Sequence, residues 1–146
     1  MSRTKPAEVR FYIDADLLGL ARVLAGLRPD VTYPGDPGAV IHKRHRPPCP
    51  IVSPAAKDRE WIPEVARRGW VIITRDQHIQ AHRLEIQAVR DYGARMVALN
   101  GEDASSVFAQ LEVVMCRWRD IERHTTDLPP FIHSATRTAM RAIPVT

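Results

Sequence analysis

Two aspartates in this sequence directly follow short apolar runs. The run Val9–Ile13 leads into Asp14, and the run Val71–Thr74 leads through Arg75 into Asp76. Runs of this kind are typical of strands that are buried on both faces of a parallel sheet. Open α/β sheets place their chemistry at the carboxyl ends of the strands. We therefore expect the two carboxylates to lie close together at one edge of a sheet.

A third aspartate, Asp58, begins the helical pattern of Asp58–Arg68, and we expect it to share a site with Asp14 and Asp76. Carboxylate oxygens are ligands of hard cations such as Mg²⁺ and Mn²⁺. A cluster of acids is electrostatically unfavourable unless a cation neutralises it. The cluster thus predicts a divalent-metal site, at which a metal can activate water and orient a phosphodiester.

Each of these aspartates also has a purely structural interpretation. Asp14 and Asp16 are both suited to cap the helix that follows the first strand, and Asp58 is suited to cap its own helix. Asp76 could form a turn. Three such acids in one small domain, two of them at strand ends, favour a shared site.

The elements that would position the acids alternate between strand and helix, which predicts an α/β fold. The expected strands are Val9–Ile13, Asp30–Tyr33, Trp70–Thr74, Arg95–Leu99 and an edge hairpin of Phe131–Ala135 and Thr138–Ile143. The expected helices start at Asp16, Asp58 and Leu84, and Asp103 is expected to cap a long fourth helix. The apolar stripe of that fourth helix is Val107, Phe108, Leu111, Val114, Met115, Trp118 and Ile121. Segment 34–54 holds six prolines and is expected to be irregular.

Three short motifs resemble the PIN-like fold. They are the strand ending at Asp14, the helix that places Asp58 before Trp61–Ala66, and the strand of Gly69–Asp76. They are most similar to the VapC-type toxin ribonucleases and to PIN-like proteins that share the "iTrD" motif. The resemblance implies a three-layer fold with a central, mostly parallel sheet flanked by helices. With 146 residues, the chain is expected to form one such domain, residues 1–146.

The resemblance also implies an activity, namely Mg²⁺- or Mn²⁺-dependent endonucleolytic cleavage of RNA. Asp14, Asp58 and Asp76 would be the catalytic residues and metal ligands. The candidates for a fourth acidic ligand are Asp16, Glu85 and Glu60. Members of the VapC type are usually encoded beside an antitoxin protein that blocks the site, and PIN-like domains often form homodimers. PIN nucleases typically also have an acidic residue soon after the first helices. In this sequence that region is the proline-rich segment, where Asp36 is the candidate for that position.

Basic residues supply candidate contacts to RNA phosphates. The densest basic run is His42–Arg46, of which Lys43, Arg44 and Arg46 are the expected contacts, unless the run is only a solvated loop. Arg75 and His78 flank Asp76 and could hold a phosphate near the metal. The net charge of +4 permits such a polyanionic partner without requiring one.

Other functions fit parts of the same pattern. Asp14-Ala15-Asp16 after a strand resembles the nucleophile and acid of haloacid-dehalogenase-like phosphatases, although no lysine followed by a paired-acid motif accompanies it. A receiver-like or partner-binding module could use the acids only to bind Mg²⁺, and a PIN-like domain could bind RNA or an antitoxin without cutting. The two cysteines, Cys49 and Cys116, fit no metal or redox spacing, and no signal-peptide or membrane-length run is present, so we expect a cytoplasmic protein.

Overall fold

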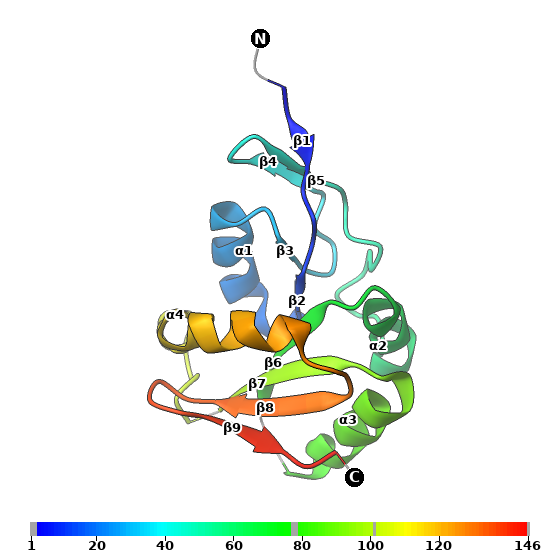
Figure 1. The fold of residues 1–146 in the computed structure, drawn as a ribbon, viewed down its shortest axis with the longest axis vertical. Helices are drawn as coiled ribbons and strands as arrows, with labels where there is room; N and C mark the ends of the chain where they lie inside the picture. Colours follow the sequence, from blue (N-terminus) through cyan, green and yellow to red (C-terminus); the bar gives the residue numbers. More distant parts are fainter. Residues whose placement is uncertain (1–2, 77–78, 101, 146) are drawn as a thin grey trace.

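A six-stranded sheet forms the centre of the molecule (Figure 1). The computed structural model describes residues 3–76, 79–100 and 102–145, with only the backbone described at residues 76 and 79–83. In spatial order the strands are β3 (Val31–Thr32), β2 (Phe11–Ile13), β6 (Val71–Asp76), β7 (Arg95–Asn100), β8 (Phe131–Ala135) and β9 (Met140–Ile143). All neighbouring strands are parallel except β8 and β9, which form the expected antiparallel edge hairpin. The mostly parallel sheet is confirmed.

Helices cover both faces of this sheet. They are α1 (Leu18–Leu27), α2 (Asp58–Arg67), α3 (Ile79–Tyr92) and α4 (Val107–Arg123), with short 3₁₀ turns η1 (Ala15–Leu17) and η2 (His124–Thr126). Alternate strand residues point to opposite faces. Phe11 and Ile73 join the core under α1 and α4, whereas Tyr12 and Ile72 join the core under α2 and α3. The fold therefore has three layers, as expected (Figure 1).

A second, smaller sheet corrects the expectation of an irregular segment 34–54. It consists of β1 (Lys5–Pro6), β5 (Arg44–Arg46) and β4 (Ala39–Ile41), in that spatial order. The hairpin of β4 and β5 turns at His42 (φ 50°) and Lys43 (φ 63°). Two consecutive positive φ values define the tight type I′ turn that matches the twist of paired strands. In Figure 1 this sheet projects beyond the end of the main sheet.

A buried ion pair attaches the small sheet to the three-layer part of the protein. Arg46 is 2% exposed, and its Nε donates to Oδ2 of Asp36, which is 3% exposed, at 2.7 Å. Nη1 of Arg46 donates to the carbonyls of Ala25 (3.0 Å) and Arg28 (3.1 Å) at the end of α1. The prediction that Arg46 contacts RNA is therefore wrong, because its guanidinium is enclosed by the protein. Asp36, engaged in the same pair, does not serve as a metal ligand.

The long helix α4 differs from its predicted form in two ways. Its N-cap is Ser106, whose Oγ accepts from the backbone N of Ala109 at 3.1 Å, so the helix is not capped by Asp103. The buried side is also narrower than the predicted stripe, since Phe108 is 78% exposed. Gln110 is buried instead, which is tolerated because its Nε2 donates to the Ala104 carbonyl at 3.1 Å.

We expect Gly38→Ala to destabilise the protein by about 2 kcal/mol or more, because a side chain at this left-handed position is strained. Gly38 has φ +83°, and an added Cβ would lie 2.5 Å from the Arg46 carbonyl oxygen. Gly93→Ala is the matched control, since Gly93 has φ +66° with nothing within 4 Å of the added Cβ. Urea unfolding compares the two variants, and equal losses would contradict the close approach at Gly38.

Among the described residues, no helix has both the length and the apolar character that crossing a membrane requires.

Candidate metal centre

Asp14 lies where β2 ends, against the neighbouring strand β6. Its backbone N donates to the Ile73 carbonyl at 2.9 Å, which extends the β2–β6 pairing by one residue. Oδ1 of Asp14 accepts from the Ala15 N at 2.6 Å, and Oδ2 accepts from Oγ1 of Thr74 at 2.9 Å. Asp14 therefore caps η1, as its structural interpretation predicted. Two donors fix the orientation of its carboxylate and still leave lone pairs on both oxygens.

Asp14 interacts electrostatically with two other acids, Asp16 and Asp58. Burial raises the pKa of Asp14, and the charge of Asp58 adds to this rise, while hydrogen bonds from Thr74 and Ala15 oppose it. Burial and the charge of Asp14 raise the pKa of Asp16 to about 7, against a hydrogen bond from the backbone N–H of Arg75. Asp14 thus interacts electrostatically with both Asp16 and Asp58, while the role of these acids as metal ligands stays a prediction.

Asp58 is the first residue of α2 and is held there by aromatic packing. Nε1 of Trp61 donates to Oδ1 of Asp58 at 3.1 Å, and the Trp61 ring stacks on Tyr12 of β2 at 5.0 Å between centroids. The Tyr12 pKa is raised by burial and by the charges of Asp14 and Asp58. The exposed Asp58 side chain also borders a surface depression between α2 and α3, together with Lys57 and Tyr92.

Asp76 is the last residue of β6, at the same sheet edge as Asp14, because β2 and β6 are parallel neighbours. Its backbone lies opposite Asn100, the last residue of β7. The side chain of Asp76 and all of His78 lie outside the described residues. The strand-end position of Asp76 thus agrees with the prediction, and its role as ligand stays a prediction.

The other predicted site residues are distributed over α3, β6, α2 and the β4–β5 hairpin. Glu85 is half-buried in the middle of α3, and Arg75 is half-buried in β6, where its charge lowers the pKa of Asp16. Lys43 and Arg44 are exposed on the β4–β5 hairpin. Glu60 is exposed on α2, in the same turn as Asp58.

Two residues of this edge were not assigned to the site from the sequence. Thr74 orients Asp14 through its hydroxyl group, and Asn100 ends β7 beside the end of β6. Oδ1 of Asn100 accepts from the Glu102 N at 3.0 Å and so forms a turn there. The sequence did contain a sign of Asn100, since it directly follows the apolar run Met96–Leu99, much as Asp76 follows its own run.

The donor set fits a hard divalent cation. It consists of carboxylates and a hydroxyl group, which are oxygen ligands. Burial raises the pKa values of Asp14 and Asp16, neighbouring negative charges add to the rise, and a bound cation would favour the charged carboxylates. Among the described residues, the carboxylates of Asp14, Asp16 and Asp58 do not all come within 4.8 Å of one another. Direct bonds to all three are not needed, since Mg²⁺ keeps several waters and uses one or two carboxylates.

Comparison with known families identifies the architecture around this edge. A family model described as "PIN like domain" matches residues 9–101, which include β2, α2, β6 and β7 with all the acids of the candidate site. Comparisons with curated proteins and with solved structures gave no significant match.

Proposed function

The chain belongs to the PIN-like domain family, and we propose that it is a metal-dependent endoribonuclease that hydrolyses RNA phosphodiester bonds. PIN-like domains have a nuclease-type fold and generally use divalent metals. The observation that carries the proposal is that Asp14 interacts electrostatically with Asp16 and with Asp58 at the sheet edge where β6 ends at Asp76. This family assignment favours a nuclease over the phosphatase and receiver-like alternatives.

Each acid has a role in this proposal. Asp14, Asp58 and Asp76 would hold Mg²⁺ or Mn²⁺, with Asp16 or Glu85 as the fourth acid. When bound, such an ion supplies activation of water and neutralisation of charge on the leaving oxygen. Thr74 donates to Oδ2 of Asp14 and so keeps the carboxylate in one orientation.

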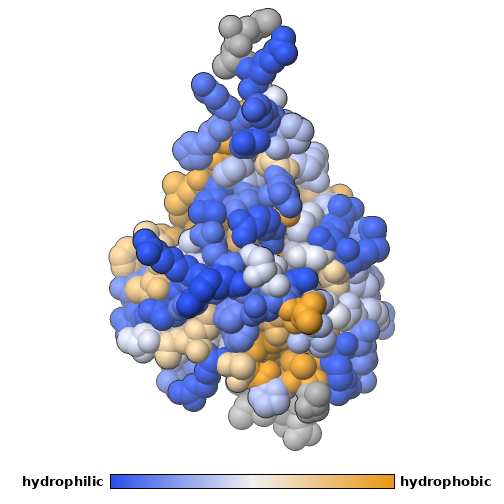
Figure 2. Space-filling view, viewed as in Figure 1, coloured by the Kyte–Doolittle hydropathy of each residue, from blue (hydrophilic) through white to orange (hydrophobic). Residues whose placement is uncertain are grey.

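Exposed basic residues near the cluster and on the small sheet would bind the RNA backbone. Lys43 and Arg44 lie on the projecting hairpin beside the exposed Lys5 and His45, and Figure 2 shows hydrophilic surface over this end of the molecule. Phosphate contacts position nucleic acid without reading its sequence. The hairpin would bind a part of the RNA backbone away from the cut, whereas Arg75, whose charge lowers the pKa of Asp16, would hold a phosphate at the carboxylate edge.

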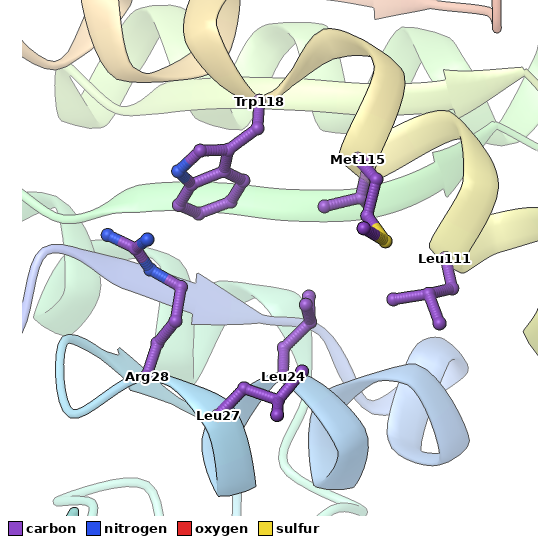
Figure 3. A pocket seen from close by; sticks show the side chains of 7 residues that line it. Leu24, Leu27, Arg28, Leu111, Met115 and Trp118 are labelled. Carbon is purple, nitrogen blue, oxygen red and sulfur yellow. The ribbon is translucent and has the colours of Figure 1, made fainter. Parts of the chain in front are cut away.

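The second half of the proposal is that the chain is a toxin whose cognate antitoxin protein blocks it. An apolar groove between α1 and α4 is a candidate antitoxin surface, and there the side chains of Leu24 and Leu27 face Leu111 and Met115 (Figure 3). Leu27 is 58% exposed and Met115 is 68% exposed. Exposed apolar patches of this kind mark protein-binding surfaces. The same groove would also suit a homodimer.

We expect purified protein to cut a mixed pool of structured RNAs only when Mg²⁺ or Mn²⁺ is present. Removal of the metal with EDTA should abolish cleavage, because in this proposal the metal activates the water and neutralises charge on the leaving oxygen. Readdition of Mg²⁺ in excess of the chelator should restore it. Gel analysis of end-labelled RNA reports both states. Cutting that continues at full rate in EDTA would contradict the proposed function.

A further inference from the structure

Two histidines and an aspartate meet where α4 ends and β8 begins. His124 is the first residue of η2, Asp127 caps the end of η2, and His133 lies in the middle of β8. One ligand atom from each residue lies within 4.8 Å of the others. None of these residues was singled out from the sequence, because the two histidines are nine positions apart and only the fold brings them together.

Contacts among the three side chains show a compact group. Nδ1 of His124 lies 2.6 Å from Oδ2 of Asp127, and the rings of His124 and His133 stack with centroids 3.8 Å apart. In a tetrahedral site with bonds near 2.0 Å, two ligand atoms are about 3.3 Å apart. The His124 and Asp127 atoms would therefore move apart by less than about 1 Å to accept an ion between them.

Two arginine side chains from other parts of the chain form hydrogen bonds to the turn that carries His124 and Asp127. Nη1 of Arg95 donates to the carbonyl of Thr125 at 3.2 Å and to that of Asp127. Nη2 of Arg10 donates to Oγ1 of Thr125 at 3.0 Å. Arg95 of β7 thus fixes the backbone of the turn, and Arg10, just before β2, holds the side chain of Thr125. A site whose ligands are fixed in advance binds a metal with less loss of conformational entropy.

This group is separate from the carboxylate edge. His133 lies on β8, three strands away from Asp14 beside β2, which corresponds to about 14 Å at the usual strand spacing. η2 precedes β8, so it lies towards the opposite end of this strand from the carboxylate edge. The ligand chemistry also differs, since imidazole suits Zn²⁺ and similar transition metals, whereas Mg²⁺ prefers oxygen.

We propose that His124, Asp127 and His133 form a second metal site, which takes a transition-metal ion of the Zn²⁺ class. Two imidazoles and one carboxylate supply three ligands, and water completes the tetrahedron. Because the ligands come from η2 and β8, a bound ion joins the end of α4 to the main sheet.

The test is calorimetric titration of ZnCl₂ into metal-free protein, with Mg²⁺ present in excess to occupy the carboxylate site. Wild type should bind one Zn²⁺ ion per chain at this site. Loss of an outer-sphere partner alone weakens metal binding by about 10- to 100-fold, so loss of a ligand in His124→Ala or Asp127→Asn should weaken it by about 100-fold or more. Asp127 is exposed, so its variant keeps the test valid if His124→Ala does not fold.

His45→Ala is the matched control, because His45 is an exposed histidine on β5, far from η2. It should bind Zn²⁺ as wild type does. Bound Co²⁺ should show the intense visible absorption of a tetrahedral site in wild type and in His45→Ala, and lose it in Asp127→Asn. The proposal is overturned if wild type binds no Zn²⁺, or if the folded His124→Ala and Asp127→Asn variants keep wild-type affinity.

Discussion

Replacing Asp14 with asparagine should lower the rate of RNA cleavage by about 100- to 1,000-fold. A metal at this site contributes several kcal/mol to transition-state charge stabilisation, and each 1.36 kcal/mol corresponds to about tenfold in rate. Asparagine has the shape of aspartate and can still accept from the Ala15 N through its amide oxygen. The variant should therefore lose the metal ligand without losing the η1 cap. Single-turnover cleavage under saturating Mg²⁺ measures the effect.

The stability of Asp14→Asn separates a lost ligand from a damaged fold. Burial raises the pKa of Asp14, so the charged carboxylate is disfavoured in the metal-free protein. A neutral amide should leave the metal-free unfolding temperature unchanged or higher. The control is Asp30→Asn, which removes the partner of Arg28 beside the start of β3, at the other end of the sheet. It should keep wild-type activity, and an equal loss of cleavage in both variants would contradict the site.

Arg46→Ala should destabilise the protein by about 3–5 kcal/mol, because it leaves a buried carboxylate without its partner. Asp36 would stay enclosed with its charge unpaired, and the carbonyls of Ala25 and Arg28 would lose their donor. The free energy of unfolding, measured by urea denaturation at neutral pH, reports the effect.

Arg44→Ala is the matched control for Arg46→Ala, since both arginines lie on β5 and Arg44 is exposed. Its free energy of unfolding should stay within about 0.5 kcal/mol of wild type. RNA binding should instead weaken, and the salt dependence of log K should fall by about one unit. A result in which Arg44→Ala unfolds the protein and Arg46→Ala does not would contradict the assignment of structural and RNA-binding arginines.

The main sheet was predictable because burial on both faces leaves a direct trace in the sequence. The apolar runs before Asp14 and Asp76 form β2 and β6, and helix α2 begins at Asp58 as its periodicity predicted. The edge hairpin of β8 and β9 was also expected. The location of the candidate site could be predicted as well, because neighbouring parallel strands bring their carboxyl ends to one edge of the sheet.

The small sheet was not predictable because its stability comes from distant residues. Its turn uses His42 and Lys43 at positive φ, where glycine and asparagine are the usual signals. The ion pair of Arg46 with Asp36 joins residues ten positions apart, and the guanidinium then reaches α1. A basic run in a proline-rich segment gives no sign that its last arginine is buried. The group of His124 and His133 was hidden for a similar reason, since η2 and β8 meet only in the fold.

The chemistry of the cut ends tests the central claim most directly. If the carboxylate cluster holds a metal that activates water, then the products of Mg²⁺-dependent cleavage should carry no 2′,3′-cyclic phosphate, because water and not the ribose 2′-hydroxyl attacks phosphorus. Mass spectrometry of the products from a short RNA, cut by wild type beside Asp14→Asn, gives the answer. Linear phosphate termini in wild type, absent in the variant, are the predicted result. Cyclic phosphate termini formed equally by both proteins would contradict hydrolysis at this site.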